Sequence, residues 1–402
     1  MLDLKKINEL LDFIEIKDLS ELKQFPQPSK IYISNNCFFI ISSSDGLSNY
    51  NNIISELYFN KKEISETIDK EDFIKEFDKT LLNLKTNNTK FSQKKIDNFY
   101  KYFFNIPLEE FTIAKEIYGI ILNNLEAPYE LGPFTIYFLE LYKKLLSQEN
   151  KIFELEDDIF FRGWQGSFVV TVQVKARSIN KAKELAFELF YKFELFIYFT
   201  LNDYNQKHFI SIVSKLPYPY DNCLILGSKN KSGNFSRVIL EAIPLDDPYF
   251  KDSSIGNNNL WKLLENKSYN SLEKRIISSI EWIGKANSEI NIINRFLFYI
   301  IALESVLTIQ EQSLVNPSVA STICEGAAFI LGSSLEDRIQ IENLVKNLYK
   351  TRSALAHGKD KDINSEELLI AAAISENIIH RLLSDQKLLQ LKSPSELSNY
   401  LK

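Results

Sequence analysis

The sequence predicts an α+β N-terminal region followed by an all-α antiparallel helical bundle. One observation behind this prediction is a change in composition. Residues 271–402 hold only six of the chain's 29 Phe and 19 Tyr residues taken together, but ten of its 16 Ala residues. Another is a change in pattern, because runs of β-branched and aromatic residues occur before that point, whereas helix-capping residues recur after it. The two parts of the chain are therefore built differently.

The length and charge of the chain limit the kinds of function it can have. Its 402 residues, 45% hydrophobic and 25% charged, suffice for two or three globular domains with ample cores. It has 47 basic and 53 acidic residues, and therefore a formal net charge of −6. This balance argues against a protein that coats nucleic acid by general electrostatic attraction. Any contact with nucleic acid must be local.

The sequence predicts a cytoplasmic location and no membrane partner. The first residues lack the apolar run of a signal peptide. The most apolar stretches, 187–201 and 296–307, are shorter than the roughly 18 residues of a membrane span, and each contains Glu. Three widely spaced cysteines without a CxxC pair fit free thiols in a reducing compartment. With only three histidines, we expect no metal site and no cofactor.

Helices and one hairpin are expected in the first 150 residues. Residues 31–41 predict a β-hairpin, because Asn35 and Asn36 lie between two apolar runs and tolerate the positive φ of a tight turn. Apolar spacing predicts helices around residues 3–25, 62–85, 92–104 and 108–125.

The next hundred residues combine strands with one long helix. The clearest strand is 168–176, which is rich in β-branched residues. Ser178 follows it and can cap a helix from about 180 to 199. A polar turn then separates two further strands, near 222–227 and 235–243.

Helices with identifiable ends fill the last third of the chain. Asn270, Ser334 and Asn364 can cap helix N-termini, and each is followed three residues later by an acidic residue. Gly358 is a natural stop for the helix that begins at Ser334. Short loops between such helices imply an antiparallel bundle. The expected helices are 270–288, 291–312, 317–330, 334–358, 364–385 and a short one from 393.

These elements divide the chain into three parts. Residues 1–150 form a mostly helical region with a β-hairpin, and residues 151–265 form an α+β domain. The first region is either a separate domain or one domain with the second. Residues 266–402 form the helical bundle.

The candidate catalytic residues lie near the end of the fourth bundle helix, where Arg352 and His357 are five residues apart. On a helix this spacing separates them by about 140° around the axis and about 7.5 Å along it. One copy would not focus both side chains on one phosphate. Two copies across a two-fold axis would form a cleft with two arginines and two histidines, which suffices to bind a phosphodiester and move its protons. We therefore expect a homodimer, or a higher even oligomer, formed through the bundle.

At Arg352-x4-His357 the sequence resembles the HEPN superfamily (higher eukaryotes and prokaryotes nucleotide-binding), whose signature is Arg, four to six residues, then His. The resemblance covers roughly residues 270–390 and is strongest to the Apea-like branch. It depends on a bundle, a motif at a helix end, a glycine after the motif and an acid-bearing helix upstream. The matching residues are Arg295-Phe-Leu-Phe-Tyr-Ile-Ile-Ala-Leu-Glu304-Ser-Val-Leu307, Arg338, and Leu348-Tyr-Lys-Thr-Arg-Ser-Ala-Leu-Ala-His-Gly358.

The resemblance implies metal-independent cleavage of RNA in a dimer, which leaves a 2′,3′-cyclic phosphate end. His357 would remove the 2′-hydroxyl proton or protonate the leaving 5′-oxygen. Arg352 would pair with the scissile phosphate and stabilise the developing negative charge. Ser353 would orient His357 or the phosphate. DNA should resist cleavage because it lacks the internal nucleophile.

Each candidate also has a structural interpretation. Arg352 and His357 would suit the negative end of a helix dipole without any catalysis. Glu304 lies on an otherwise apolar helix face and needs a partner, for which Arg295, Arg338 and Arg352 are the candidates. A pair with Arg352 would position that arginine.

The aromatic and remaining histidine side chains favour structural roles. Tyr349, one turn before the motif arginine, favours packing in the core or dimer over stacking on a base. His208 follows a polar stretch and is expected on the surface. His380 lies in the last long helix without any motif, which favours a structural role.

Two functional hypotheses follow. In the first, the protein is an endoribonuclease that acts as a toxin or antiphage (antiviral) defence effector, and its N-terminal domain senses a phage or regulatory trigger. The defence role follows from the resemblance alone. In the second, the bundle is a non-catalytic HEPN dimerisation or nucleotide-binding module, and the N-terminal domain carries the function.

Overall fold

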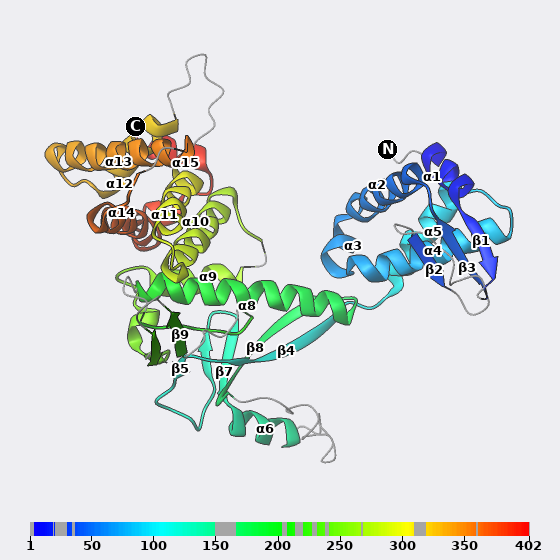
Figure 1. Cartoon of the computed structure of the whole chain (residues 1–402), viewed down its shortest axis with the longest axis horizontal. Helices are drawn as coiled ribbons and strands as arrows, with labels where there is room; N and C mark the ends of the chain where they lie inside the picture. Colours follow the sequence, from blue (N-terminus) through cyan, green and yellow to red (C-terminus); the bar gives the residue numbers. More distant parts are fainter. Residues whose placement is uncertain are drawn as a thin grey trace. The chain divides into compact units, whose positions relative to one another are not determined.

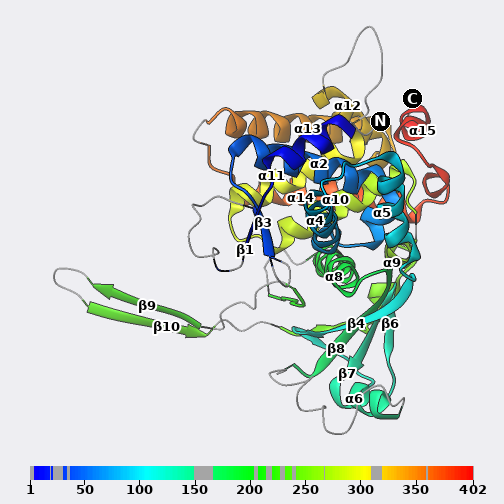
Figure 2. The same cartoon turned by 90° about the vertical axis from the view of Figure 1, so that its right-hand side faces the viewer.

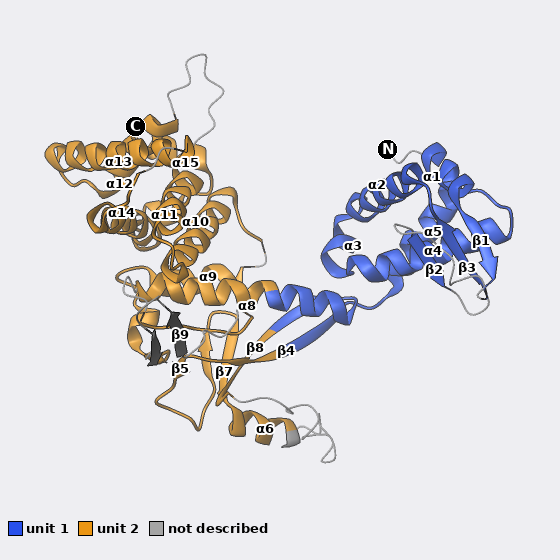
Figure 3. Cartoon of the chain, in the orientation of Figure 1, with its two compact units in different colours: residues 1–113, 173–187 blue, residues 114–172, 188–402 orange. Residues whose placement is uncertain are grey.

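The chain forms two units in this computed structural model, and Figure 3 colours them separately. Unit 1 comprises residues 1–113 and 173–187, and unit 2 comprises residues 114–172 and 188–402. The residues that the structure describes are 4–18, 20, 30–33, 37–148, 166–202, 207–213, 220–226, 231–237, 241–266, 268–308, 319–358 and 361–401.

Unit 1 combines a small antiparallel sheet with helices. The strand order is β1-β3-β2, and the central strand β3 is buried along most of its length. Apolar side chains from the sheet and the helices form one core. The elements are α1 (Leu4–Leu10), η1 (Leu11–Phe13), β1 (Glu15–Asp18), β2 (Lys30–Ile33), β3 (Cys37–Ile41), α2 (Ser44–Asn60), α3 (Lys62–Thr67), α4 (Lys70–Thr86) and α5 (Gln93–Asn105).

Aromatic rings and one buried polar network hold unit 1 together. Phe73 of α4 stacks on Phe103 of α5, with ring centroids 5.2 Å apart. The Tyr50 hydroxyl donates to Asp78 Oδ1 at 2.5 Å, and Lys30 Nζ lies 2.8 Å from Asp78 Oδ2. Burial raises the pKa of Asp78, although hydrogen bonds from Lys30 and Tyr50 oppose that shift. The network therefore ties β2, α2 and α4 together.

A four-stranded sheet in the order β4-β8-β7-β6 forms the base of unit 2. Helix α8 packs on it through aromatic rings. The ring centroids of Phe134 in β7 and Phe193 in α8 are 4.5 Å apart, and those of Phe193 and Trp261 in α9 are 5.6 Å apart. Strands β4 and β8 and helix α8 each extend into unit 1. The elements are β4 (Glu109–Ile117), β6 (Tyr129–Leu131), β7 (Phe134–Phe138), α6 (Leu139–Gln148), β8 (Phe168–Ala176), α8 (Ile179–Leu201) and α9 (Asn257–Glu265).

Two smaller strand pairs accompany this sheet. Strands β9 (Tyr220–Leu226) and β10 (Lys231–Arg237) pair in antiparallel fashion, as Figure 2 shows. Strands β5 (Ile120–Ile121) and β11 (Ile243–Pro244) form a short parallel pair.

Packed helices make up the C-terminal part of unit 2, and Figure 1 shows α10 to α14 gathered there. Helix α11 lies between its neighbours and buries one long apolar face, including Phe296, Tyr299 and Leu303. The helices are α10 (Ser271–Ser288), α11 (Ile292–Leu307), α12 (Val319–Leu331), α13 (Leu335–Ala356), α14 (Ser365–Ser384) and α15 (Pro394–Leu401), with the short turns η3 (Pro248–Lys251) and η4 (Leu388–Gln390).

Capping residues explain where these helices begin. Asn270, Ser334 and Asn364 each form a full capping box. The capping side chain accepts from the backbone N–H three residues later, and the acidic side chain at that position accepts from the N–H of the capping residue. Asn291 accepts from two N–H groups at the start of α11. The predicted order, an α+β region followed by helices, is therefore confirmed. The predicted helix 291–312 is shorter than expected, because α11 ends at Leu307 and Thr308 is its C-cap. The other predicted ends that fall among the described residues agree to within two residues, because the capping signals are local.

Several N-terminal expectations were correct. The hairpin at 31–41 is present as the antiparallel pair β2 and β3, although its turn residues lie outside the described part. The strand 168–176 and the helix after it are present, and Ser178 Oγ accepts from the Lys181 N–H. The helix at 92–104 corresponds to α5.

Other N-terminal expectations were wrong. The predicted helix at 108–125 is instead β4 and β5, because pairing with β8 and β11 overrides the helix-like spacing of its charges. The predicted helix at 3–25 ends early and leads into β1. The segment 62–85 is two helices, since Asp69 caps a new helix at Lys70. Strand β10 begins and ends several residues before the predicted 235–243.

The division of the chain at residues 150 and 265 stays a prediction. Among the described residues, no helix combines the length and the apolar character that a membrane crossing requires.

Candidate functional site

Helix α13 carries the motif and ends where the sequence predicts. His357 is its C-cap residue, and its N–H donates to the Ser353 carbonyl at 3.1 Å. Gly358 follows with a φ of 69°, a left-handed conformation that glycine adopts without a steric penalty. Arg352 and His357 therefore lie on the last turns of a 22-residue helix.

A polar brace fixes the C-terminal turns of α13 to the start of α14. Thr351 is 1% exposed, and its hydroxyl donates to Glu367 Oε1 at 2.9 Å. Lys361 Nζ lies 3.0 Å from the same oxygen and also contacts the Thr351 hydroxyl. Burial acts to raise the pKa of Glu367, but hydrogen bonds from Lys361 and Thr351 outweigh it, so that the pKa lies below its usual range. Arg352 therefore directly follows a residue that is hydrogen-bonded to α14.

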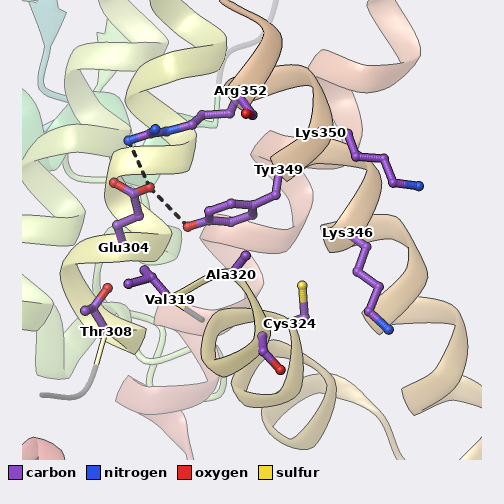
Figure 4. A pocket seen from close by; sticks show the side chains of 11 residues that line it. Glu304, Thr308, Val319, Ala320, Cys324, Lys346, Tyr349, Lys350 and Arg352 are labelled. Carbon is purple, nitrogen blue, oxygen red and sulfur yellow. Dashed lines mark hydrogen bonds and ion pairs between the residues drawn. The ribbon is translucent and has the colours of Figure 1, made fainter. Parts of the chain in front are cut away.

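Arg352 is held by an acid from another helix. Its Nη2 lies 3.4 Å from Glu304 Oε1 on α11, and the Tyr349 hydroxyl donates to the same oxygen at 3.2 Å. Figure 4 shows Arg352 and Tyr349 converging on the carboxylate of Glu304. Of the three arginines that the sequence offers to Glu304, the structure thus places Arg352 beside it.

Tyr349 serves this group as a hydrogen-bond donor. Burial, and then the negative charge of Glu304 that its hydroxyl faces, raise the pKa of Tyr349 far above its ordinary value. The hydroxyl therefore stays protonated at any physiological pH and keeps donating to the carboxylate. Its position orients Glu304, which in turn orients the guanidinium of Arg352.

His357 and Ser353 are exposed residues of the same helix end. Within the described part of the chain, the His357 side chain has no hydrogen bond or ion pair, and nothing joins it to Arg352. One copy of the chain therefore does not bring the imidazole and the guanidinium to one point, in agreement with their angular separation on a helix. Ser353 shares a pocket with Arg352, whereas His357 does not line it.

That pocket lies between α11, α12 and α13 and has a volume of about 840 Å³. The group formed by Glu304, Tyr349 and Arg352 lies on one of its sides (Figure 4). Its lining residues are Glu304, Thr308, Val319, Ala320, Ser321, Cys324, Lys346, Tyr349, Lys350, Arg352 and Ser353.

The motif segment carries a local positive charge that the whole domain lacks. Between Glu342 and Asp360 the sequence contains no acidic residue, but it contains Lys346, Lys350 and Arg352. Lys346 pairs with Glu342 at 2.5 Å, whereas the contact of Lys350 is with the Asn347 side-chain oxygen at 3.3 Å. The sequence analysis did not single out the two lysines, although they lie six and two residues before Arg352.

The other sequence candidates have structural positions. Arg338 lies over the Phe329 ring at 4.6 Å, and its Nε donates to the Gly332 carbonyl. Arg295 is buried and interacts with Tyr299. Among the described residues no group of His, Cys, Asp and Glu side chains could hold a metal ion. His208, expected on the surface, is half-buried, and its Nε2 lies 3.7 Å from Glu241 Oε2.

His380 is half-buried in the helical part of unit 2. Its Nδ1 lies 2.9 Å from the Ile255 carbonyl, and its ring lies 5.0 Å from that of Phe199. The short contact to a carbonyl requires that Nδ1 carries the proton. Burial lowers the pKa of His380, although the bond to Ile255 opposes the shift.

The lowered pKa of His380 predicts a loss of stability in mild acid. The unfolded chain binds a proton at His380 near pH 6.5, whereas the folded chain does so only at lower pH, so the free energy of unfolding falls as pH drops through this window. We expect the melting temperature to fall between about pH 7.5 and 5.5. In His380→Asn, whose amide can still donate to Ile255, this fall should be smaller. Equal pH profiles for the two proteins, measured by calorimetry, would contradict the assignment.

Comparison with family models, curated proteins and solved structures gives no match for this chain.

Proposed function

We propose that the protein is a metal-independent endoribonuclease of the HEPN superfamily, Apea-like branch, that cleaves RNA through its 2′-hydroxyl at a dimeric composite site. The observation that carries this proposal is the fixed position of Arg352. Glu304 and Tyr349 hold its guanidinium at a helix end, and His357 follows it within a segment free of acids. Such an arrangement suits the recognition of one phosphodiester rather than general attraction to RNA.

The chemistry assigns one task to each side chain. Arg352 pairs with the scissile phosphate and stabilises the extra charge of the pentacoordinate transition state. His357 is exposed. It takes the proton from the 2′-hydroxyl or gives a proton to the leaving 5′-oxygen. Glu304 and Tyr349 act on the phosphate only through Arg352, and are positioning residues. Ser353 lies beside Arg352 in the pocket and can donate to a phosphate oxygen.

A second copy of the chain completes the site. Attack by the 2′-oxygen and departure of the 5′-oxygen occur on opposite sides of the phosphorus, so a base is needed on one side and an acid on the other. Two His357 imidazoles related by a two-fold axis meet this need, whereas one does not. The bundle is therefore proposed to form a homodimer, with the N-terminal domain sensing a phage or regulatory trigger and the nuclease acting as a toxin or defence effector.

The alternative is a non-catalytic module for dimerisation or nucleotide binding. The ion pair of Arg352 with Glu304 favours it, because an arginine already paired at 3.4 Å also fits a structural role. The two functions predict different behaviour towards RNA, so one experiment separates them.

The test uses RNA, EDTA and a single 2′-deoxy substitution. The purified protein is incubated with a short RNA of defined sequence in EDTA, and the product ends are identified by mass spectrometry. We expect cleavage with 2′,3′-cyclic phosphate ends, and no cleavage when the nucleotide before the cut carries no 2′-hydroxyl. Cleavage abolished by EDTA would refute the metal-free mechanism, and cleavage of the 2′-deoxy substrate would refute attack by the internal nucleophile.

A further inference from the structure

The pocket beside Arg352 combines an apolar wall with cationic edges. Its volume of about 840 Å³ is in the range of sites that enclose small molecules. One wall is the start of α12, which contributes Val319, Ala320 and Cys324. The opposite wall is α13, which contributes the ring of Tyr349. Apolar side chains on one wall and a tyrosine ring on the other suit an aromatic ring system, and a nucleobase is the aromatic group that RNA offers.

The cations of the pocket lie on two sides of Tyr349. Arg352 and Lys350 are two positions apart on α13, which places them about 160° apart by the shorter way around the helix, with Tyr349 on the face between them. Figure 4 shows Arg352 on one side of the tyrosine ring and Lys350, with Lys346, on the other. A ligand that bridges these sides must carry negative charge at both ends and an apolar middle.

The charges distinguish Lys350 from the other cations. Arg352 forms an ion pair with Glu304, and Lys346 forms one with Glu342. The described residues give Lys350 only the neutral oxygen of Asn347 at 3.3 Å. Its charge is therefore the one in the pocket that no carboxylate among these residues balances. An incoming phosphate would meet it without displacing an acidic partner.

We propose that this pocket binds one ribonucleotide of the RNA substrate, with its base between Tyr349 and the α12 wall and its two flanking phosphates on Arg352 and Lys350. This inference rests on the proposed function, because it identifies the phosphate at Arg352 as the scissile one. It adds a base-binding subsite to the nuclease. Cleavage then depends on the identity of the base next to the cut.

The first test measures binding without cleavage. The probes are the four nucleoside 3′,5′-bisphosphates, which contain no phosphodiester to cut, and 1-deoxyribose 3,5-bisphosphate, which keeps both phosphates but has no base. Ala320→Phe fills the pocket from α12, and Ala373→Phe places the same ring on an exposed position of α14 as the matched control. We expect Ala320→Phe to weaken binding of the preferred bisphosphate by about tenfold or more, the scale of losing one stacked base. Ala373→Phe should leave binding unchanged.

The second test concerns Lys350 and the flanking phosphate. A single-stranded DNA oligonucleotide serves as an uncleavable probe, and its affinity is measured against salt concentration. Lys350→Ala should reduce the slope of log affinity against log salt by about 0.7, because one phosphate contact is lost. Lys274→Ala, at an exposed position of α10, should keep the wild-type slope.

The outcomes separate this inference from the proposed function. If 1-deoxyribose 3,5-bisphosphate binds as tightly as every nucleoside bisphosphate, or if Ala320→Phe binds like Ala373→Phe, the pocket holds no base. The inference is then overturned, while RNA cleavage still supports the nuclease. If the bisphosphates bind with the expected variant effects but RNA is not cleaved, the nucleotide pocket is supported and the nuclease is refuted. An unchanged salt slope in Lys350→Ala would overturn the second phosphate contact.

Discussion

Replacing Arg352 with alanine is expected to lower the rate of RNA cleavage by about 10²–10³-fold, and replacing His357 with alanine by about 10²–10⁴-fold. The first figure is the typical cost of removing one charge-stabilising donor from a transition state, and the second that of removing a general acid or base. The rates are measured on one defined RNA in EDTA, under single-turnover conditions. Cleavage by both variants at the wild-type rate would contradict the nuclease.

These losses should not come from unfolding. The side chains of Arg352 and Glu304 are 40% and 24% exposed, so solvent screens their ion pair, and pairs of this kind stabilise proteins by about 1 kcal/mol or less. His357 is exposed. Melting temperatures of both variants should therefore stay close to that of the wild type. Arg352→Lys is the matched control for charge: it keeps the positive charge but loses the planar fork, and should recover only part of the rate.

Tyr349→Phe separates positioning from chemistry. The variant keeps the ring but removes the hydroxyl that donates to Glu304 Oε1. If the tyrosine acts only through Glu304 and Arg352, its loss should lower the rate less than the loss of Arg352 does. It should also leave the pH dependence of cleavage unchanged, because the hydroxyl does not titrate in the physiological range.

The composite site makes activity depend on association of two copies. Arg352 and His357 have no contact with one another in one copy, so dilution below the dissociation constant of the dimer should lower the activity per chain. Size-exclusion chromatography with light scattering at the same concentrations gives the fraction of dimer. A protein that is strictly monomeric and cleaves at full rate would contradict the composite site.

The capping residues explain why the C-terminal helices were predictable. Asn270, Ser334 and Asn364 act on the backbone within three residues of themselves, so their effect depends little on the rest of the fold. Strand β4 was not predictable in this way. Its Glu109, Glu110, Lys115 and Glu116 resemble the charged face of a helix, and only pairing with β8, which is more than fifty residues away, makes the segment a strand.

The candidate site shows the same limit. The motif residues could be named from the sequence, and so could the need of Glu304 for a cationic partner. Which arginine it would meet depends on how α11 packs along α13, which no local pattern specifies. The pocket requires still more, because Ala320 and Lys350 become its walls only when α12 lies against α13.

Replacing Gly284 with alanine is expected to destabilise unit 2 by roughly 2–3 kcal/mol, the cost of overpacking a close contact. Gly284 lies in the middle of α10, and a Cβ there would lie 2.2 Å from the Leu195 carbonyl oxygen of α8. The nearest atoms belong to the backbone, so no side-chain rotation can relieve the clash, and the helices must separate. Calorimetry should give a melting temperature lower by about 5–10 °C.

Gly326→Ala is the matched control, since Gly326 is also a helical glycine of unit 2. A Cβ at this position would lie 3.3 Å from Leu307 Cδ2, the end of a flexible side chain. The gain in helix propensity, up to about 1 kcal/mol, should therefore offset or exceed the cost of crowding. If Gly284→Ala melts at the temperature of the wild type, α8 and α10 do not approach as closely as described. Helix α8 would then not pack closely on α10, which in turn packs against α11, the helix that carries Glu304.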